Sequence, residues 1–418
     1  MFKSIPRFFS GVLGLAFLGR ITAIAARLHI IPFFPEFMER FDLTYAQMGL
    51  LYSAFFLAYG ICLVPMGIAA DRFSPRLLFA AGWGVAGLGI ASFAWAPSFG
   101  WLLAARILAG VGVASLYPAT FKLIATHISS EKRGKAMGLL EVGAGMGMLL
   151  TVTAAPALIA WLPLPVIFLA TGGLALPAIV ALLALPEAPA PPRTAPAAAP
   201  QAAPGIARGS ELLRQPRFWF YLLQTLLVMA TINGLIGWFP TYLQQLGIEK
   251  VGVGLAMGLI NVGQMGAAWP AGGISDRIGR RTPVIHTGSA LLILLPLALL
   301  FGASGATLLM VLATLYGMGI GISGVPTGTL GTELFGRRWA GTVSSAAAAC
   351  SMIASSATGT LFGWIVDAGG FTPIWILISA MLLLRILLTA LIGEGVQPAP
   401  APAPGRLQPA LISKEGLR

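Results

Sequence analysis

The chain has 418 residues, of which 57% are hydrophobic and only 10% are charged, and its mean hydropathy is +0.86. Soluble domains carry about 25% charged residues, so a water-soluble fold of this composition would lack the charges that cover a surface. The composition therefore excludes an ordinary soluble protein and indicates a chain whose main solvent is lipid. The net charge of +12 does not indicate a nucleic-acid partner, because the basic residues stand in short clusters between apolar segments.

The first apolar segment contains Arg20 and Arg27 and lacks a convincing small-residue cleavage site. We therefore expect a retained first helix rather than a signal peptide. Counting this one, the chain holds twelve apolar segments, each long enough to cross a hydrocarbon core of about 30 Å as a helix. They run near 9–32, 46–70, 76–96, 99–124, 134–158, 164–185, 217–243, 252–275, 283–302, 305–330, 340–366 and 372–393.

A Pro/Ala-rich stretch, PEAPAPPRTAPAAAPQAAPGIA, follows the sixth segment and has no means of forming a core. We therefore predict an all-α membrane protein with twelve transmembrane helices in two pseudo-symmetric six-helix bundles. The predicted parts are an N-terminal bundle at 1–185, a cytoplasmic linker at 186–215, a C-terminal bundle at 216–394 and a disordered cytoplasmic tail at 395–418.

The distribution of basic residues predicts the orientation. The loops on the side of the two termini hold most of the Lys and Arg residues, whereas the opposite loops hold Arg40 and Lys250. Cytoplasmic loops of membrane proteins carry an excess of Lys and Arg. We predict that both termini are cytoplasmic and that the chain is a multi-pass protein of the cell inner (plasma) membrane.

The two halves carry similar loops after their second helices, GIAADRFSPR at 67–76 and GGISDRIGRR at 272–281. Internal repeats of this size are typical of secondary transporters that rock one half against the other. The loops resemble the signature of the major facilitator superfamily. The second copy matches that signature at Gly272, Asp276, Arg277, Gly279, Arg280 and Arg281, and the first copy matches it at Gly67, Asp71, Arg72 and Arg76.

The resemblance is incomplete in the first loop, where Ser74 stands in the place of a glycine. An acid at a helix end can meet the N-terminus of a neighbouring helix and the basic residues beside it. Such a conformational latch would favour the outward-open state and release in the inward-open state. The alternative is that these charges only set the topology. Arg106, Gly110 and Gly112 resemble the fourth-helix motif of the same superfamily.

The stretch from Arg27 to Arg76 also resembles the organic-anion branch of that superfamily, the anion:cation symporters. In that branch the first-helix Arg in the register of Arg27 contacts the substrate carboxylate, and the second-helix Tyr in the register of Tyr59 lies nearby. The chain departs from the pattern at Ala26 and Val113, where members often carry the acids that take the coupling proton. The resemblance therefore does not imply proton coupling through those two positions.

Charged side chains inside a membrane span are costly and are usually functional. Arg20 and Arg27 are seven residues apart, on nearly the same helix face, and a guanidinium suits a carboxylate or a phosphate. The residues alone place Arg20 near mid-membrane and Arg27 nearer the outside, where it would alternatively extend to the outer headgroups. The mid-span amides Asn233, Asn261 and Gln264 either bind a polar substrate or bond to one another.

Two further residues are candidates for proton coupling. Glu141 is the acid placed well inside a predicted span, and burial suits a carboxyl to carry a proton. Its alternative is a structural pair with Arg106 or Lys122. Arg106 either takes part in proton movement or braces the helix packing. We expect His29, near the outer surface, to be an interfacial residue rather than a proton site.

The sequence contains no phosphate-binding loop, no metal-ligand spacing and no convincing nucleophile–base pair, so we expect neither an enzyme nor a cofactor or metal. The leading hypothesis is a monomeric, proton- or ion-coupled carrier that moves a small organic anion by alternating access through a central cavity in the lipid bilayer. One alternative is a proton-coupled efflux carrier of hydrophobic or cationic compounds, with Glu141 as the acid of its cavity. Another is a membrane sensor that keeps the fold without transport.

Overall fold

The computed structural model describes residues 7–128, 130–154, 158, 161–176, 179–180, 212–336 and 339–393. Within these residues the secondary structure is entirely helical. Most of the predicted linker at 186–215 and the whole predicted tail at 395–418 lie outside the described residues.

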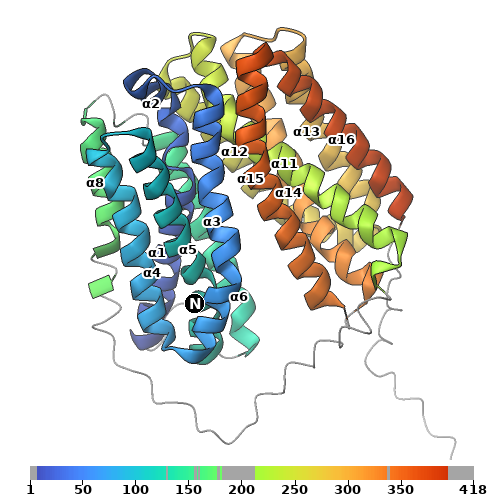
Figure 1. Ribbon diagram of the computed structural model, residues 1–418. Coiled ribbons are helices and arrows are strands. Elements are labelled where there is room, and N and C mark those ends of the chain that lie inside the picture. The colour runs from blue at the N-terminus through green and yellow to red at the C-terminus, as the bar shows by residue number, and fades with distance from the viewer. Residues whose placement is uncertain are drawn as a thin grey trace, which may run out of the picture.

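The helices form two bundles that lie side by side in the order of the chain (Figure 1). The first bundle contains α1 (Arg7–Leu28), η1 (Ile31–Phe33), α2 (Phe34–Phe41), α3 (Tyr45–Arg72), α4 (Pro75–Ala91), η2 (Ser92–Trp95), α5 (Phe99–His127), α6 (Ser130–Met148), the π-helix η3 (Leu149–Ala154) and α8 (Leu164–Gly173). The second contains α11 (Pro216–Gln245), α12 (Lys250–Ile278), α13 (Thr282–Leu300), α14 (Ala306–Phe335), α15 (Ala340–Gly369) and α16 (Thr372–Ile392).

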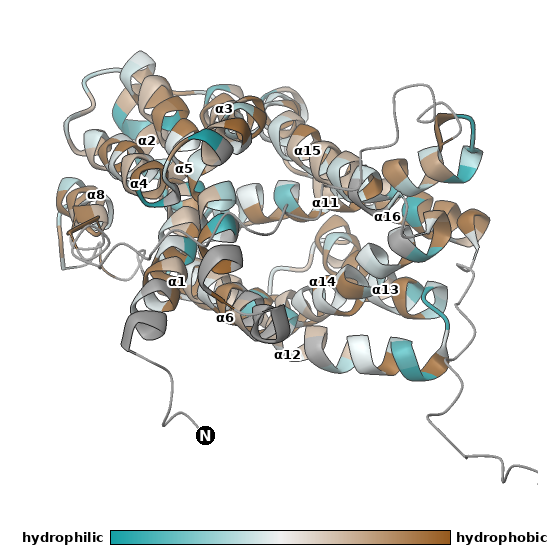
Figure 2. Cartoon of the chain, turned by 90° about the horizontal axis from the view of Figure 1, so that it is seen from below, coloured by the Kyte–Doolittle hydropathy of each residue, from teal (hydrophilic) through white to brown (hydrophobic). Residues whose placement is uncertain are grey.

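The described residues include 10 helices that are long and apolar enough to cross a membrane. Two shorter apolar helices, Val142–Thr153 and Leu164–Gly173, lie where the fifth and sixth spans are predicted, next to residues that are not described. Large apolar side chains are exposed on many helices, among them Leu387 and Leu391 of α16 at 55% and 56%, as lipid contact requires. Figure 2 shows such apolar positions around the outside of both bundles.

The first span differs from the single helix predicted at 9–32. It runs from Leu13 to Phe41 and is interrupted after α1 by two turn residues and the 3₁₀ turn η1. Pro32 and Pro35 stand in the first turns of η1 and α2, where a missing N–H costs nothing and the fixed φ favours helix initiation. Arg27 therefore lies directly before the interruption and Arg20 seven residues before Arg27, and their depths in the membrane stay predictions.

The bundles touch along α3 with α15 and along α6 and η3 with α12 (Figure 2). Glycines permit the close approach of α3 and α15: a Cβ on Gly49 would lie 2.1 Å from the carbonyl oxygen of Gly359, and one on Gly363 would lie 2.2 Å from that of Tyr45. On the other side, a Cβ on Gly254 would lie 2.7 Å from the carbonyl oxygen of Thr153.

These contacts lie at one end of the molecule, which we call the closed end and define by α2 and residues 43–46, 245–250 and 367–371. The opposite end, called the basic end, holds the start of α1 and the loops at 72–76 and 277–281. Figure 1 shows the bundles close together at the closed end and diverging toward the basic end. Beyond the contact of Gly60 with Met352, no contact between α3 and α15 is found among the described glycine and side-chain contacts.

Candidate functional site

Arg27 lies between the bundles at the end of α1, where the first span is interrupted. Its guanidinium stacks on the ring of Phe56 of α3, with the carbon Cζ 4.8 Å from the ring centroid. Nη2 donates a hydrogen bond to Oδ1 of Asn233 in α11, across the interface between the bundles. The Nε atom is buried and has no hydrogen-bond partner among the described residues. The Nε–H therefore lacks an acceptor and lies beside the Nη2–H that Asn233 holds.

Arg106 of α5 is fully buried and closes the broken end of α1. The last carbonyls of a helix lack partners within the helix, and cations near them are stabilised. Arg106 donates from Nη1 to the oxygen of Ala26 at 2.8 Å, from Nη2 to that of Arg27 at 3.2 Å and from Nε to that of Leu51 in α3 at 3.2 Å. This geometry supports the bracing role and fixes the backbone that carries Arg27.

The neighbourhood of Arg27 is strongly positive. The described side chains offer no carboxylate to either Arg27 or Arg106. The two guanidinium groups meet carbonyl oxygens, the amide oxygen of Asn233, the hydroxyl of Tyr52 and the rings of Phe56 and Phe55. Two guanidinium groups in a low-dielectric setting attract an anion more strongly than they would in water. The arrangement can therefore bind a carboxylate without covalent chemistry.

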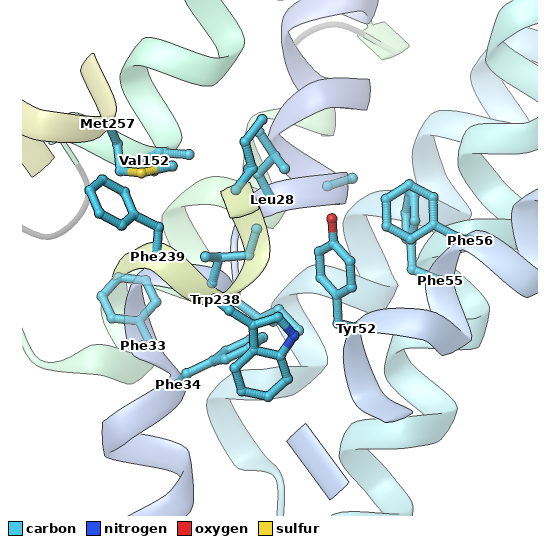
Figure 3. Close-up of a cluster of buried hydrophobic side chains, with 14 of the residues drawn as sticks. Leu28, Phe33, Phe34, Tyr52, Phe55, Phe56, Val152, Trp238, Phe239 and Met257 are labelled. Atoms are coloured by element: carbon cyan, nitrogen blue, oxygen red, sulfur yellow. The ribbon is translucent and has the colours of Figure 1, made fainter. Parts of the chain in front are cut away.

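Tyr52 and Asn233 complete the wall on the side of the closed end. The hydroxyl of Tyr52, a side chain with 1% exposure, donates to the backbone oxygen of Asn233 at 3.4 Å. A Cβ on Gly237 would lie 3.6 Å from the Tyr52 ring, so this glycine leaves room for it against α11. Figure 3 shows Tyr52 beside Trp238, whose indole meets Phe34 edge-on with 5.6 Å between the ring centroids.

Tyr59 and Arg20 lie further toward the basic end. Tyr59 stacks on Phe55 with 6.2 Å between ring centroids, and both Arg20 and Arg27 act electrostatically on its hydroxyl. The Arg20 guanidinium lies 6.0 Å from the ring centroid of Tyr117. Arg20, Arg27 and Tyr59 thus lie in one neighbourhood, and their role in substrate binding stays a prediction.

The amides of α12 lie apart from Arg27. Asn261 is buried and donates from Nδ2 to the backbone oxygen of Gly145 in α6 at 2.8 Å, so it joins the two bundles. Gln264 lies one turn away and is half-buried. Glu141 falls in α6, but its side chain lies outside the described residues.

His29 differs from the expectation of an interfacial residue. It is 3% exposed and packs edge-on against Phe93 and Phe168, with ring centroids 5.1 and 5.7 Å away. Its Nδ1 bonds to the oxygen of Ala26 at 2.8 Å. The interruption of α1 turns the chain inward at this point, which the hydropathy pattern does not reveal.

The closed end holds polar contacts between the bundles that no sequence motif marks. The carboxylate of Asp367, at the end of α15, accepts the backbone N–H of Tyr45 at 2.9 Å and of Ala46 at 2.8 Å, at the start of α3. Glu36 of α2 forms an ion pair with Lys250 of α12. Each contact joins one bundle to the other.

The second signature loop is held within its own bundle. Arg281 donates from Nη1 to Asp276 at 2.6 Å and from Nη2 to Glu333 of α14 at 2.8 Å, and the hydrogen bond to Glu333 is the main cause that raises the pKa of Arg281. Asp276 itself is 70% exposed. Gly279 ends α12 with φ of 70°, a left-handed conformation that favours glycine.

The first loop takes a different turn, which accounts for its departure from the signature. Ser74, at the position equivalent to Gly279, has φ of −58°, and α4 begins directly after it at Pro75. A glycine is therefore not required there. Arg72 is exposed, and the side chain of Asp71 lies outside the described residues, so the predicted latch in this loop stays a prediction.

Sequence reasoning missed two residues beside Arg27, namely Tyr52 and Phe56. It also missed two acidic residues near helix ends, Asp367 and Glu333. Tyr52 stands seven residues before Tyr59 and thus on nearly the same face of α3, which was a usable signal. Asp367 and Glu333 follow long apolar segments and look like ordinary helix-end charges in the sequence.

Comparisons with known proteins agree with this architecture. The model of the Major Facilitator Superfamily matches residues 16–359. Among solved structures, a bacterial homolog of the human lysosomal transporter Spinster in an inward-facing and occupied conformation superposes with a TM-score of 0.75 at 16% identity, covering 93% of this chain and 97% of the other. A D-xylose-proton symporter gives 0.76 at 17% identity, covering 93% and 98%.

Sequence relatives match either nearly the whole chain or less than a third of it. The D-galactonate transporter of Escherichia coli O6:H1 is 24% identical over 89% of this chain and 91% of its own length. The niacin transporter NiaP of Acinetobacter baylyi is 35% identical over 26% of this chain, and the uncharacterized MFS-type transporter Rv1250 of Mycobacterium tuberculosis is 31% identical over 30% of it. In these two matches the chain spans 24% and 22% of the relative's length.

The match of the family model over most of the chain and the two helical bundles lead to one assignment. The chain belongs to the major facilitator superfamily and is a multi-pass membrane transporter rather than an enzyme.

Proposed function

We propose that this transporter carries a small organic anion whose carboxylate binds Arg27. The observation that supports this most directly is the buried, unpartnered Nε of Arg27 beside the fully buried Arg106, with no carboxylate on either group among the described side chains. A bidentate guanidinium–carboxylate pair uses this Nε–H together with the Nη2–H that Asn233 holds in this structure. Two of the relatives are named as transporters of D-galactonate and of niacin. Both compounds are organic acids, which agrees with the proposed substrate class.

The same proposal includes a membrane orientation. The basic end holds Arg72, Arg76, Arg277, Arg280 and Arg281, and cytoplasmic loops are enriched in such residues. With the basic end in the cytoplasm of the inner membrane, both termini are cytoplasmic and the structure is inward-open. Among the described residues, Asp276 then pairs with Arg281 of its own bundle in this state, in keeping with a latch that engages in the outward-open state.

Transport against a gradient would take its free energy from a proton or ion gradient, because the sequence has no nucleotide-binding loop. Glu141 is our candidate for the proton carrier. In proteoliposomes, Glu141→Gln should abolish acceleration of uptake by an inward proton gradient while leaving exchange of labelled for unlabelled substrate intact. Unchanged acceleration would remove Glu141 from this role.

The substrate class is tested by thermal stabilisation of the purified chain in detergent, because a ligand that binds the folded state raises its melting temperature. The compounds are D-galactonate, nicotinate, D-galactose and a lipophilic cation. We expect stabilisation by a carboxylate that Arg27→Ala loses and that Arg40→Ala, which removes an exposed arginine of α2, keeps. Stabilisation by the lipophilic cation alone would refute the proposal and support the efflux alternative.

A further inference from the structure

The hydrogen bond between Arg27 and Asn233 sits where a substrate carboxylate would bind. Asn233 Oδ1 accepts from Nη2, the atom that forms one guanidinium edge together with the unpartnered Nε. A carboxylate that binds this edge with both oxygens needs Nε and Nη2 together. The amide oxygen and the carboxylate therefore compete for the same N–H.

The orientation of the Asn233 amide is fixed by its second bond. Nδ2 donates to the backbone oxygen of Met229, one turn earlier in α11, at 2.8 Å. The side chain is 3% exposed, and the Tyr52 hydroxyl holds its backbone oxygen at 3.4 Å. In this rotamer Asn233 presents an acceptor to Arg27 and has no N–H directed toward a carboxylate.

We propose that Asn233 is a stand-in for the substrate carboxylate. Its oxygen satisfies Arg27 and ties α11 to α1 until an anion takes the Nε–Nη2 edge and displaces it. This inference rests on the proposed function, because it requires that the ligand of Arg27 be a carboxylate. It assigns Asn233 a role in specificity and in coupling substrate binding to movement of the bundles.

The stand-in discriminates by charge. Exchange of the amide oxygen for a neutral hydroxyl replaces one neutral acceptor by another and gains little. Exchange for a carboxylate replaces a neutral acceptor by a charged one, and such charge-assisted bonds are about twice as strong. A neutral sugar of similar shape is thus rejected at this position without any repulsive group. Displacement also removes a direct tie between the bundles, since α1 and α11 belong to different ones.

The test compares two substitutions that must act in opposite directions. Dissociation constants for D-galactonate and nicotinate are measured by calorimetry on the full-length protein in detergent. Asn233→Ala removes the competitor and leaves Arg27 unsatisfied, so carboxylate affinity should rise about tenfold, given what a hydrogen bond to a charged group contributes. Asn233→Asp supplies a permanent carboxylate, so affinity should fall by at least about tenfold.

A pH series and a matched control separate this role from damage to the fold. Lowering the pH should restore binding in Asn233→Asp, because protonation of the introduced carboxyl weakens its hold on Arg27; a misfolded variant would not recover. The control is Thr231→Val in the same helix, whose hydroxyl bonds to Leu227 of its own helix at 2.8 Å. It should leave both constants unchanged.

Each outcome decides between the two proposals. Suppose that both substitutions at Asn233 weaken carboxylate binding while the wild type binds carboxylate through Arg27. The proposal that Asn233 is a stand-in is then wrong, and the proposed function stands. If the wild type binds neither D-galactonate nor nicotinate and Arg27→Ala behaves like it, the proposed function and the stand-in both fall. Tighter binding in Asn233→Ala with weaker, acid-restored binding in Asn233→Asp establishes the stand-in.

Discussion

The carboxylate of Asp367 should bias the transporter toward the state with a closed end. The start of α3 has four backbone N–H groups to satisfy. A capping box satisfies two of them: Thr44 Oγ1 accepts from the N–H of Gln47 at 3.2 Å, and the Gln47 side chain accepts from that of Thr44 at 2.9 Å. The remaining two, on Tyr45 and Ala46, are satisfied by Asp367 from the other bundle. Separation of the bundles must therefore expose both.

The free energy by which Asp367 favours the closed form follows from these two hydrogen bonds. A hydrogen bond to a charged group contributes about 1.5 to 3 kcal/mol when buried, and an anion at a helix N-terminus about 0.3 to 1 kcal/mol when exposed. Asp367 is exposed, so we expect about 2 kcal/mol in all from its carboxylate at low salt. Asp367→Ala should shift the ratio of closed to open forms of this end roughly thirtyfold. Asp367→Asn, which keeps one acceptor oxygen, should shift it less.

The distance across the closed end can be measured by electron spin resonance between labels at Pro97→Cys and Ser304→Cys. Both positions are exposed in loops of different bundles, and Cys62 and Cys350 are replaced by serine. The control is Asp42→Asn, because Asp42 lies at the same end with φ of 51°, a conformation that Asn adopts readily. Distance distributions that are identical in Asp367→Ala, Asp42→Asn and the parent protein would refute the reasoning.

Three further predictions concern stability, measured as free energy of unfolding in detergent. Arg106→Met should cost about 2 to 4 kcal/mol, because the buried carbonyl oxygen of Arg27 loses its partner and that of Ala26 keeps only His29. Arg385→Met in α16 should cost less, about 1 kcal/mol, because Ser289 and Thr327 keep bonds to their own helices and the bond lost by Gln224 is long, at 3.4 Å. Equal costs would contradict this difference. Glu333→Gln and Arg281→Lys should each lower the free energy of unfolding by about 1 kcal/mol, and the double variant should lose little more than either alone. A double-mutant cycle measures this coupling, and additive losses would mean that the pair is not coupled. Gly279→Ala should cost about 1 kcal/mol while Ser74→Gly gains nothing, and a gain at Ser74 would show that both loops need the same turn.

Hydropathy was sufficient for the spans of this protein because a membrane imposes length and composition on each helix. It placed the ends of α11, α13 and α16 within a few residues. It did not reveal the interruption after Leu28 or the helix that follows, since the prolines and the charged residues Glu36, Glu39 and Arg40 make residues 33–41 look like a loop after the span.

The contacts that organise the site were less accessible to sequence reasoning because they join side chains to distant backbone. Arg106 and Asp367 bond to carbonyl and N–H groups, which every residue type provides, so no partner residue marks them in the sequence. The tie between Arg27 and Asn233 joins two residues that were both candidates, but their pairing required the relative placement of the bundles.

The contact of Asp367 with the start of α3 also has a consequence for mutational tolerance. One partner is a particular carboxylate, whereas the other consists of two main-chain N–H groups that any residue except proline supplies at positions 45 and 46. A saturation library should therefore record a narrow choice at 367 and, for this contact, a broad one at Ala46. Methods that infer proximity from paired substitutions would miss the contact, because one side of it has no side chain to vary.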